Sequence, residues 1–452
     1  MKLGMISLGC SKNQIDTELF LGVAQKYNIE ITNEIEDADI LVVNTCGFIE
    51  SAKKEAIDTI LEMAEYKEQG KIVIAMGCLV ERYLDSLKES MPEVDYFIPI
   101  KDYKQIDRVF KQITSSNESY LFDYTNRMLT TLPHSAYIRI AEGCNNRCSY
   151  CAIPLIRGNF VSRPLNDILE EAKVLVNNGA KELTVIAQDT TRYGTDLKEN
   201  GLTEDLLLAL SNIEGVEWVR ILYLYPDEVT DELLNVMTNS EKIVPYFDLP
   251  LQHASDNMLK AMNRRGMKKD IYELINKIRN IPHSILRTTF IVGFPGETNE
   301  DYNELKDFIQ EIKFDRVGIF TYSDEEDTPG YLMEPKIKAS LMKKRYNELM
   351  KIQNSISLGK NKSLVGKTIK VLIDYYDFDK EAYVARSYAY APDDVDGCIY
   401  IKATSTLIVG EFYDVYLIWK RTVRYTRVVS CRKQIYRKGG CSAIWDKQKH
   451  GT

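Results

Sequence analysis

The chain has 452 residues, of which 44% are hydrophobic and 27% are charged. These proportions are ordinary for a globular protein, and the length allows two or three domains with cores of their own. No apolar run has the length that a membrane span needs, and the N-terminus has no signal-peptide pattern, so we expect a cytoplasmic protein with no membrane partner. The formal net charge of −8 argues against nucleic-acid binding by bulk charge and suits a basic partner better.

The first hundred residues alternate short apolar runs with helical periodicity, which predicts a parallel α/β sheet. The predicted strands are 2–8, 39–44 and 71–76, and the predicted helices are 16–27 and 52–66. Each strand is followed by a cysteine beside a glycine: Cys10, Cys46 and Cys78. Because ligands of open parallel sheets collect at the carboxyl ends of strands, we expect these thiols to converge on one metal site. Three separate buried structural cysteines are the alternative.

A second cysteine group, Cys144, Cys148 and Cys151, has the spacing C-x3-C-x2-C. Three thiolates on one loop can hold three irons of a four-iron cluster and leave the fourth iron open to a cofactor. Structural zinc is the alternative, but zinc takes four ligands, and the nearest histidine, His134, lies upstream across a predicted linker. The pattern favours an open iron–sulfur cluster. Cysteines grouped in such motifs, without the density of a disulfide scaffold, also indicate a reducing compartment.

Residues 133–335 repeat a strand-then-helix pattern six times. The predicted strands are 136–140, 183–187, 218–224, 246–249, 286–292 and 316–321. Six β/α units predict an open, partial (β/α)6 barrel, in which chemistry takes place at the C-terminal ends of the strands. The second cysteine group directly follows the first of these strands, where that rule places an active site.

The C-terminal third changes its pattern. A charged helical stretch, 336–364, connects the barrel to alternating, β-branched strands over 365–412, which predict a small β-barrel. Residues 365–412 hold five Lys and Arg against eight Asp and Glu, so this domain is acidic, and an RNA-binding barrel is usually basic. Asp393, Asp394 and Asp396 lie on a predicted turn, where we expect them to reach a basic partner.

Residues 413–452 look like an atypical basic tail, with ten Lys and Arg and two acidic residues. Two interpretations stay open. The basic and aromatic residues are of the kind that binds nucleic acid, or the segment is altered or appended sequence that need not fold. The sequence therefore does not decide whether residues 413–452 complete the β-barrel.

Several motifs together resemble one enzyme family. The loop around Cys144 resembles the radical-SAM superfamily, whose cofactor is S-adenosylmethionine (SAM). The runs Gly9-Cys10-Ser11-Lys12-Asn13-Gln14-Ile15-Asp16, Asn44-Thr45-Cys46-Gly47-Phe48-Ile49-Glu50 and Gly77-Cys78-Leu79 resemble the N-terminal domain of the methylthiotransferases. Residues 365–412 resemble their TRAM domain. The Cys-Ser-Lys-Asn run is most similar to the branch that modifies an aspartate of small-subunit ribosomal protein twelve.

The resemblance implies two [4Fe–4S] clusters, one held by Cys144, Cys148 and Cys151 and one held by Cys10, Cys46 and Cys78. It implies an α/β fold with an N-terminal methylthiotransferase domain over 1–132, a ribosomal-protein substrate and an electron donor. Tyr150 occupies the place where the superfamily has an aromatic residue near the adenine of SAM. The other candidate SAM contacts are Gln188, Arg220 and Arg287, which lie on or after barrel strands; beyond the cluster ligands no catalytic residue is assigned.

Two other functions stay open. The first is the related methylthiolation of a tRNA adenosine, which the acidic β-barrel and the Cys-Ser-Lys-Asn run disfavour. The second is a non-catalytic iron–sulfur carrier, which would not need a barrel of roughly 190 residues around an open cluster.

Overall fold

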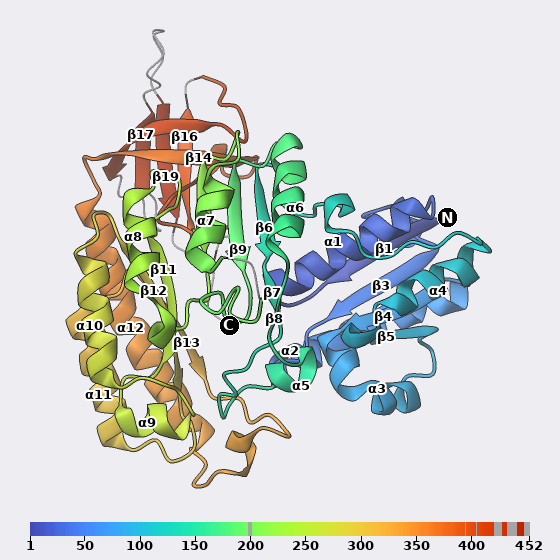
Figure 1. The fold of residues 1–452 in the computed structure, drawn as a ribbon, viewed down its shortest axis with the longest axis horizontal. Helices are drawn as coiled ribbons and strands as arrows, with labels where there is room; N and C mark the ends of the chain where they lie inside the picture. Colours follow the sequence, from blue (N-terminus) through green and yellow to red (C-terminus); the bar gives the residue numbers. More distant parts are fainter. Residues whose placement is uncertain (198–200, 394, 404, 420–426, 432–440, 447–452) are drawn as a thin grey trace.

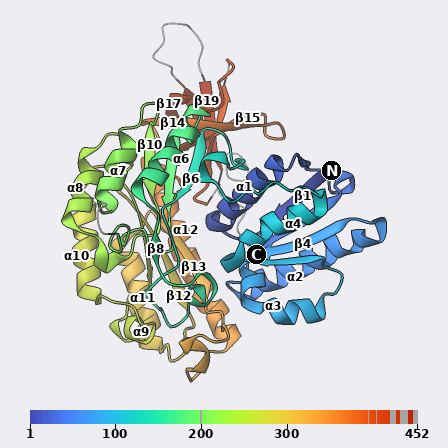
Figure 2. The ribbon, with the colours of Figure 1, turned by 45° about the vertical axis from the view of Figure 1, so that its right-hand side comes forward.

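A computed structural model describes residues 1–197, 201–393, 395–403, 405–419, 427–431 and 441–446, with side chains as far as residue 418. Three units follow one another along the chain (Figure 1). The N-terminal α/β unit lies beside a central barrel, and a small β-barrel lies at one end of that central barrel in both views (Figures 1 and 2). No helix of the described residues is long and apolar enough to cross a membrane.

The N-terminal unit is a five-stranded parallel sheet with the order β2-β1-β3-β4-β5. Its strands are β1 (Lys2–Ser7), β2 (Glu30–Ile31), β3 (Ile40–Thr45), β4 (Ile72–Gly77) and β5 (Tyr96–Pro99). Helices α1 (Ser11–Lys26) and α4 (Lys104–Thr114) cover one face, and α2 (Glu50–Ala64) and α3 (Cys78–Ser90) cover the other. The predicted β-α-β-α-β order is confirmed, because β1, β3 and β4 are the three neighbouring central strands.

The central unit has six parallel strands in two sheets of three, with the orders β10-β9-β6 and β11-β12-β13. The strands are β6 (Ser135–Arg139), β9 (Glu182–Ile186), β10 (Trp218–Ile221), β11 (Tyr246–Gln252), β12 (Ile285–Val292) and β13 (Arg316–Thr321). Outside the named strands, a single bridge, between Val219 and Ile243, joins the sheets. A short hairpin of β7 (Ala141–Glu142) and β8 (Val161–Ser162) flanks the cysteine loop. The predicted open barrel is confirmed.

Helices surround this barrel and bury one continuous apolar core against it. They are α6 (Leu165–Asn177), α7 (Thr203–Ser211), α8 (Asp231–Asn239), α9 (Asp256–Ala261), α10 (Lys268–Arg279), α11 (Asn299–Ile312) and α12 (Ala339–Ser363). The short helix α5 (Ile153–Arg157) instead packs Ile156 against Cys78 of the N-terminal unit. The predicted linking helix corresponds to α12, which packs along β13 before the chain enters the last unit.

The last unit is a closed antiparallel barrel with the order β14-β15-β16-β19-β18-β17. Its strands are β14 (Thr368–Asp377), β15 (Ala382–Ser387), β16 (Cys398–Ala403), β17 (Phe412–Trp419), β18 (Arg427–Cys431) and β19 (Cys441–Asp446). The expected end of the barrel at residue 412 needs correction, because Phe412 begins β17, which pairs along β14. Strands from the supposed tail close the barrel. The other domain limits stay predictions.

The small barrel lies at the N-terminal ends of the central strands. His134, just before β6, bonds to Asp374 at 3.1 Å, and Lys181, just before β9, pairs with Glu411 at 2.7 Å. It therefore closes the end of the central barrel opposite the cysteine loop. His134 therefore lies at the opposite end of the barrel from the cysteine loop, where it contacts Asp374. The nearest histidine cannot serve as a fourth zinc ligand.

Candidate metal centres and the residues between them

The three N-terminal cysteines lie at the carboxyl ends of the adjacent strands β1, β3 and β4. Cys10 precedes α1, Cys46 follows β3, and Cys78 is the first residue of α3. Burial raises the pKa of the Cys78 thiol to about 12; Arg157 opposes this rise, and the nearby thiols of Cys10 and Cys46 add to it. The neighbouring parallel strands thus bring the three cysteine-bearing loops to one edge of the sheet.

Glycine is required where these loops approach each other. Gly9 has a φ of 93°, and a Cβ there would lie 2.9 Å from the Cβ of Cys46. A side chain at this position would push the Cys10 loop away from the Cys46 loop. The glycine beside Cys10 therefore allows two of the three thiols to come together.

The second cysteine group lies on the loop after β7, at the C-terminal end of the central barrel. The loop is anchored by Asn146, whose amide donates to Asp189 at 2.6 Å, and by Ser149, whose backbone N–H donates to the Met262 carbonyl at 2.9 Å. Burial raises the pKa of the Cys151 thiol above its ordinary value, and the neighbouring Cys148 and Cys144 raise it further. The three thiols of this loop therefore also share one environment.

Each cysteine group has a buried guanidinium beside one of its sulfurs. Arg157 lies 3.5 Å from Cys78 Sγ, and Arg264 lies 3.8 Å from Cys148 Sγ. Positive charge at this distance stabilises a thiolate, which is the form that binds metal. Among the described residues, no group of three or more Cys, His or carboxylate side chains is close enough together to hold a metal ion as it stands. Thiol-only donor sets with adjacent cations fit iron–sulfur clusters.

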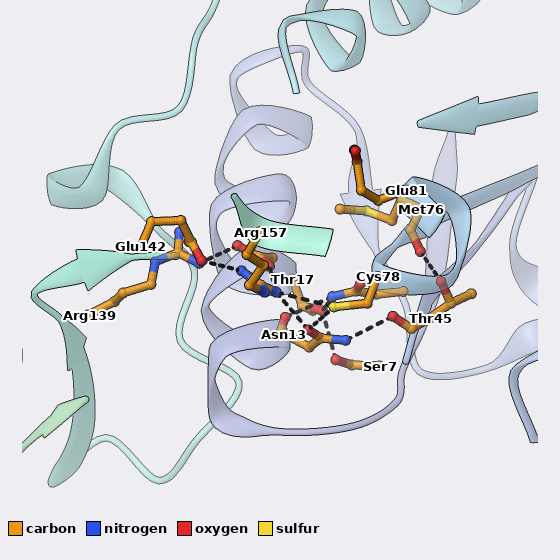
Figure 3. Close-up of polar contacts among 12 residues, drawn as sticks. Ser7, Asn13, Thr17, Thr45, Met76, Cys78, Glu81, Arg139, Glu142 and Arg157 are labelled. Atoms are coloured by element: carbon orange, nitrogen blue, oxygen red, sulfur yellow. Dashed lines mark hydrogen bonds and ion pairs between the residues drawn. The ribbon is translucent and has the colours of Figure 1, made fainter. Parts of the chain in front are cut away.

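Arg157 joins the helix after the second cysteine loop to the N-terminal cysteine site, and Figure 3 shows it beside Asn13, Glu142 and Cys78. It ends α5, the helix that follows the second cysteine loop, yet its Nη2 donates to Asn13 and Asp16 of α1, each at 2.8 Å. The same nitrogen approaches Cys78, while Nη1 donates to Glu142 at 3.0 Å. This single side chain therefore contacts the N-terminal site from the side of the central barrel.

Arg139 completes this buried network. Its Nη1 lies 2.6 Å from Asp16 and 3.0 Å from Glu142. Burial alone would raise the pKa of Asp16, but Arg139 and Arg157 lower it below its ordinary value. The carboxylate thus stays charged and holds both guanidinium groups in place. None of these residues was predicted from the sequence.

Two of the predicted SAM contacts lie near the second cysteine loop. Tyr150 lies within that loop and packs against Met258 and Phe294; burial raises its pKa, and Cys148 adds to the effect. Gln188 follows β9, and its amide donates to Glu142 at 3.1 Å. Its side-chain oxygen is buried and has no hydrogen-bond partner among the described residues, so it is available to a ligand.

The two predicted arginines lie elsewhere. Arg220 is fully buried and donates to Glu182 at 2.9 Å and to the Tyr388 carbonyl of the small barrel at 2.8 Å. Arg287 donates to Asp248 at 2.8 Å and lies 3.6 Å from Asp396. These contacts join the two barrels, and none of them reaches the cysteine loop.

The acidic turn of the small barrel also has another role than the one expected. Asp393 accepts a hydrogen bond from Tyr137 and Asp396 accepts one from Tyr246, each at 2.5 Å. The side chain of Asp396 is only 3% exposed. Asp394 lies outside the described residues. This turn therefore binds the central barrel and does not present Asp396 to a partner.

Three family signatures match the chain: UPF0004, described as an uncharacterized protein family, over residues 2–99, the radical SAM superfamily over 138–309 and the TRAM domain over 365–419. The ribosomal protein uS12 methylthiotransferase RimO of Clostridium botulinum is 49% identical over 430 residues, which span 92% of this chain and 95% of that protein. RimO of a Thermoanaerobacter species is 47% identical over 91% of this chain and 95% of its own length. This chain belongs to the RimO-type radical-SAM methylthiotransferases.

Solved structures agree with the fold. The radical SAM methyltransferase TsrM from Kitasatospora setae, with cobalamin and a [4Fe–4S] cluster bound, matches with a TM-score of 0.54 at 12% identity. That match covers 73% of this chain and 76% of TsrM. The apo form of the radical enzyme OxsB matches with a TM-score of 0.51 over 79% of this chain and 56% of its own. As a radical-SAM methylthiotransferase, the enzyme uses SAM and [4Fe–4S] clusters.

Proposed function

We propose that this methylthiotransferase attaches a methylthio group to the β carbon of an aspartate in ribosomal protein uS12. The observation that carries the proposal is the identity of 49% over 92% of the chain to a protein named as a uS12 methylthiotransferase. We further propose that Cys144, Cys148 and Cys151 hold the cluster that cleaves SAM. Cys10, Cys46 and Cys78 then hold the cluster that handles the sulfur.

Reductive cleavage of SAM supplies a radical that can remove hydrogen from an unactivated carbon, a reaction beyond any side-chain acid or base. The residues of the chain organise this chemistry. The Asn146–Asp189 contact and the packing of the partly buried Tyr150 fix the second cysteine loop at the barrel end. Arg157 and Asp16 hold the N-terminal cysteine site against that loop. The small barrel closes the opposite end, which leaves the side of the N-terminal domain for substrate.

An electron donor must reduce the cluster, and we propose that the reaction takes place in the cytoplasm, where thiols stay reduced. The tRNA adenosine alternative is disfavoured because the relatives are named as uS12 methylthiotransferases. The acidic turn adds little to that argument, since Asp393 and Asp396 are bonded inside the protein. Substrate identity must therefore be tested directly with both candidates.

The experiment supplies purified, anaerobically reconstituted enzyme with SAM, a reductant and either uS12 or tRNA. Mass spectrometry should find the methylthio mass increase on one aspartate of uS12 and none on tRNA. The matched control is the variant with Cys144, Cys148 and Cys151 all changed to Ala, which should modify neither. Modification of a tRNA adenosine with unmodified uS12 would refute the proposed substrate and keep the reaction class.

A further inference from the structure

Lys12 is a buried cation that the proposed mechanism does not yet use. It lies on the first turn of α1, two residues after Cys10, and is only 6% exposed. Its Nζ lies 3.1 Å from the centroid of the Tyr223 ring. In the part of the chain that the structure describes, no carboxylate lies within ion-pair distance of this ammonium group. A buried charge without a counter-ion is unfavourable unless something else pairs with it.

The position of Lys12 is unfavourable for a second reason. The first turn of a helix is the positive end of the helix dipole, where acidic residues stabilise and basic residues destabilise. The first turn of α1 holds no acidic residue, so nothing offsets the lysine there. Sequences break such local rules mainly at functional sites, where the group serves a ligand.

The ammonium group faces the catalytic end of the central barrel. Tyr223 is the second residue after β10, and its carbonyl accepts the backbone N–H of Thr190 at 3.1 Å. Its φ of 63° is rare for a residue with a large side chain. Asp189, next to Thr190, anchors the second cysteine loop through Asn146. Lys12 therefore lies between the loop of Cys10 and the barrel end that carries the second cysteine group.

We propose that Lys12 binds the side-chain carboxylate of the substrate aspartate. This inference rests on the proposed function, in which the β carbon next to that carboxylate is the atom modified. The Tyr223 ring holds the ammonium in place by a cation–π contact but does not neutralise it, so its charge remains for a substrate. An ion pair in this buried place fixes the β carbon between the two cysteine sites and selects an acidic side chain.

The test is a double-mutant cycle between enzyme and substrate. The enzyme is full-length and reconstituted, and uS12 carries either the aspartate located by mass spectrometry or asparagine in its place. Lys12→Met and Lys12→Gln remove the charge, and Lys12→Arg keeps it. The matched control is Lys26→Met on the same helix, where Lys26 pairs with Asp123 at 3.5 Å. Iron content is measured for each variant so that binding is compared at equal cluster loading.

For the wild type and the Lys26→Met control, the aspartate-to-asparagine change in uS12 should weaken binding roughly 10- to 100-fold. Both neutral Lys12 variants should bind the two forms of uS12 with nearly equal affinity, and Lys12→Arg should keep part of the preference. A neutral variant that still prefers aspartate as strongly as the wild type would overturn the inference. If the wild type does not modify uS12 at all, the proposed function itself is wrong.

Discussion

Arg157 shows how one side chain of the central unit can contact the cysteine site of the N-terminal unit. Its guanidinium is 1% exposed and lies against Asp16, Glu142 and the sulfur of Cys78. Hydrogen bonds and positive charge at cluster sulfurs are among the main determinants of iron–sulfur reduction potentials. We therefore expect Arg157 to raise the potential of the N-terminal cluster by stabilising its more negative, reduced form.

This expectation is tested in the variant that lacks Cys144, Cys148 and Cys151, so that only the N-terminal cluster remains. Arg157→Gln should lower the midpoint potential of that cluster by about 60–120 mV, which corresponds to the loss of one charged hydrogen bond worth about 1.5–3 kcal/mol. Redox titration followed by electron paramagnetic resonance measures it. Arg139→Gln is the control, because Arg139 shares Asp16 and Glu142 but has no described sulfur contact. Equal shifts in both variants would show that the network as a whole, not the sulfur contact, sets the potential.

The contacts of Arg157 could not have been predicted from the local sequence pattern. Its partners Asn13, Asp16 and Cys78 lie 144, 141 and 79 residues away along the chain. The predicted arginines failed to reach the cysteine loop for a related reason. The prediction that Arg220 lies on a strand is confirmed. A position on a strand does not determine which end of the barrel the side chain contacts. Glu182 and the small barrel take up its donors.

The cysteine-bearing loops could be predicted because the elements around them follow simple rules. The apolar runs of β1, β3 and β4 indicate buried parallel strands, and parallel strands end at the same edge. The burial of Cys78 beside Cys10 and Cys46 is consistent with that expectation. Whether β18 and β19 close the small barrel could not be decided from the sequence, because their segment is unusually basic and lacks a clear apolar alternation.

We expect the two cysteine groups to behave as separate units. Reconstituted wild type should hold about eight irons per chain, and removal of either group should leave about four. Changing Cys10, Cys46 and Cys78 to Ala should preserve formation of 5′-deoxyadenosine and stop methylthio transfer. Iron assay and chromatography of the SAM products measure both effects. Full transfer activity in that variant would show that the N-terminal cysteines are structural.

At the scale of the whole molecule, a buried ionic cluster fixes the small barrel to the central one. Arg386 of β15 lies 2.7 Å from Glu182 of β9 and 2.8 Å from Asp374 of β14. His134 and Arg220 extend the cluster on the central side. Removing one member of such a buried group leaves the charges of its partners buried and uncompensated, which is strongly destabilising.

Glu182→Gln should therefore lower the free energy of unfolding by about 3–5 kcal/mol. The matched control is Glu217→Gln, because Glu217 also joins the two barrels, through Lys370 at 3.1 Å, but both side chains are about half exposed. The control should lose less than about 1 kcal/mol. Urea unfolding of both variants makes the comparison; similar losses would mean that burial does not decide the strength of this interface.

The same cluster predicts a loss of stability in acid. Burial works to raise the pKa values of Glu182 and Asp374, but Arg386 and the other partners lower both below their ordinary 4.5 and 3.8. At these two carboxyl groups the folded protein therefore binds fewer protons than the unfolded chain. The cluster's contribution to the free energy of unfolding is complete above pH 4.5 and is lost as the pH falls through the lowered pKa values of the folded protein. Asp374→Asn should flatten the pH dependence of unfolding in this range. An unchanged slope would contradict the assignment.

The segment from Cys151 to Arg157 has a consequence for how the family can vary. Its one end belongs to the second cysteine loop, and its other end touches Cys78 of the first site. Because each helical residue turns the chain by about 100° and advances it about 1.5 Å, one inserted residue in α5 would turn Arg157 away from the first site. This stretch is thus a fixed spacer whose length is set by the distance between two centres. We therefore expect an insertion between Cys151 and Arg157 to separate Arg157 from Cys78.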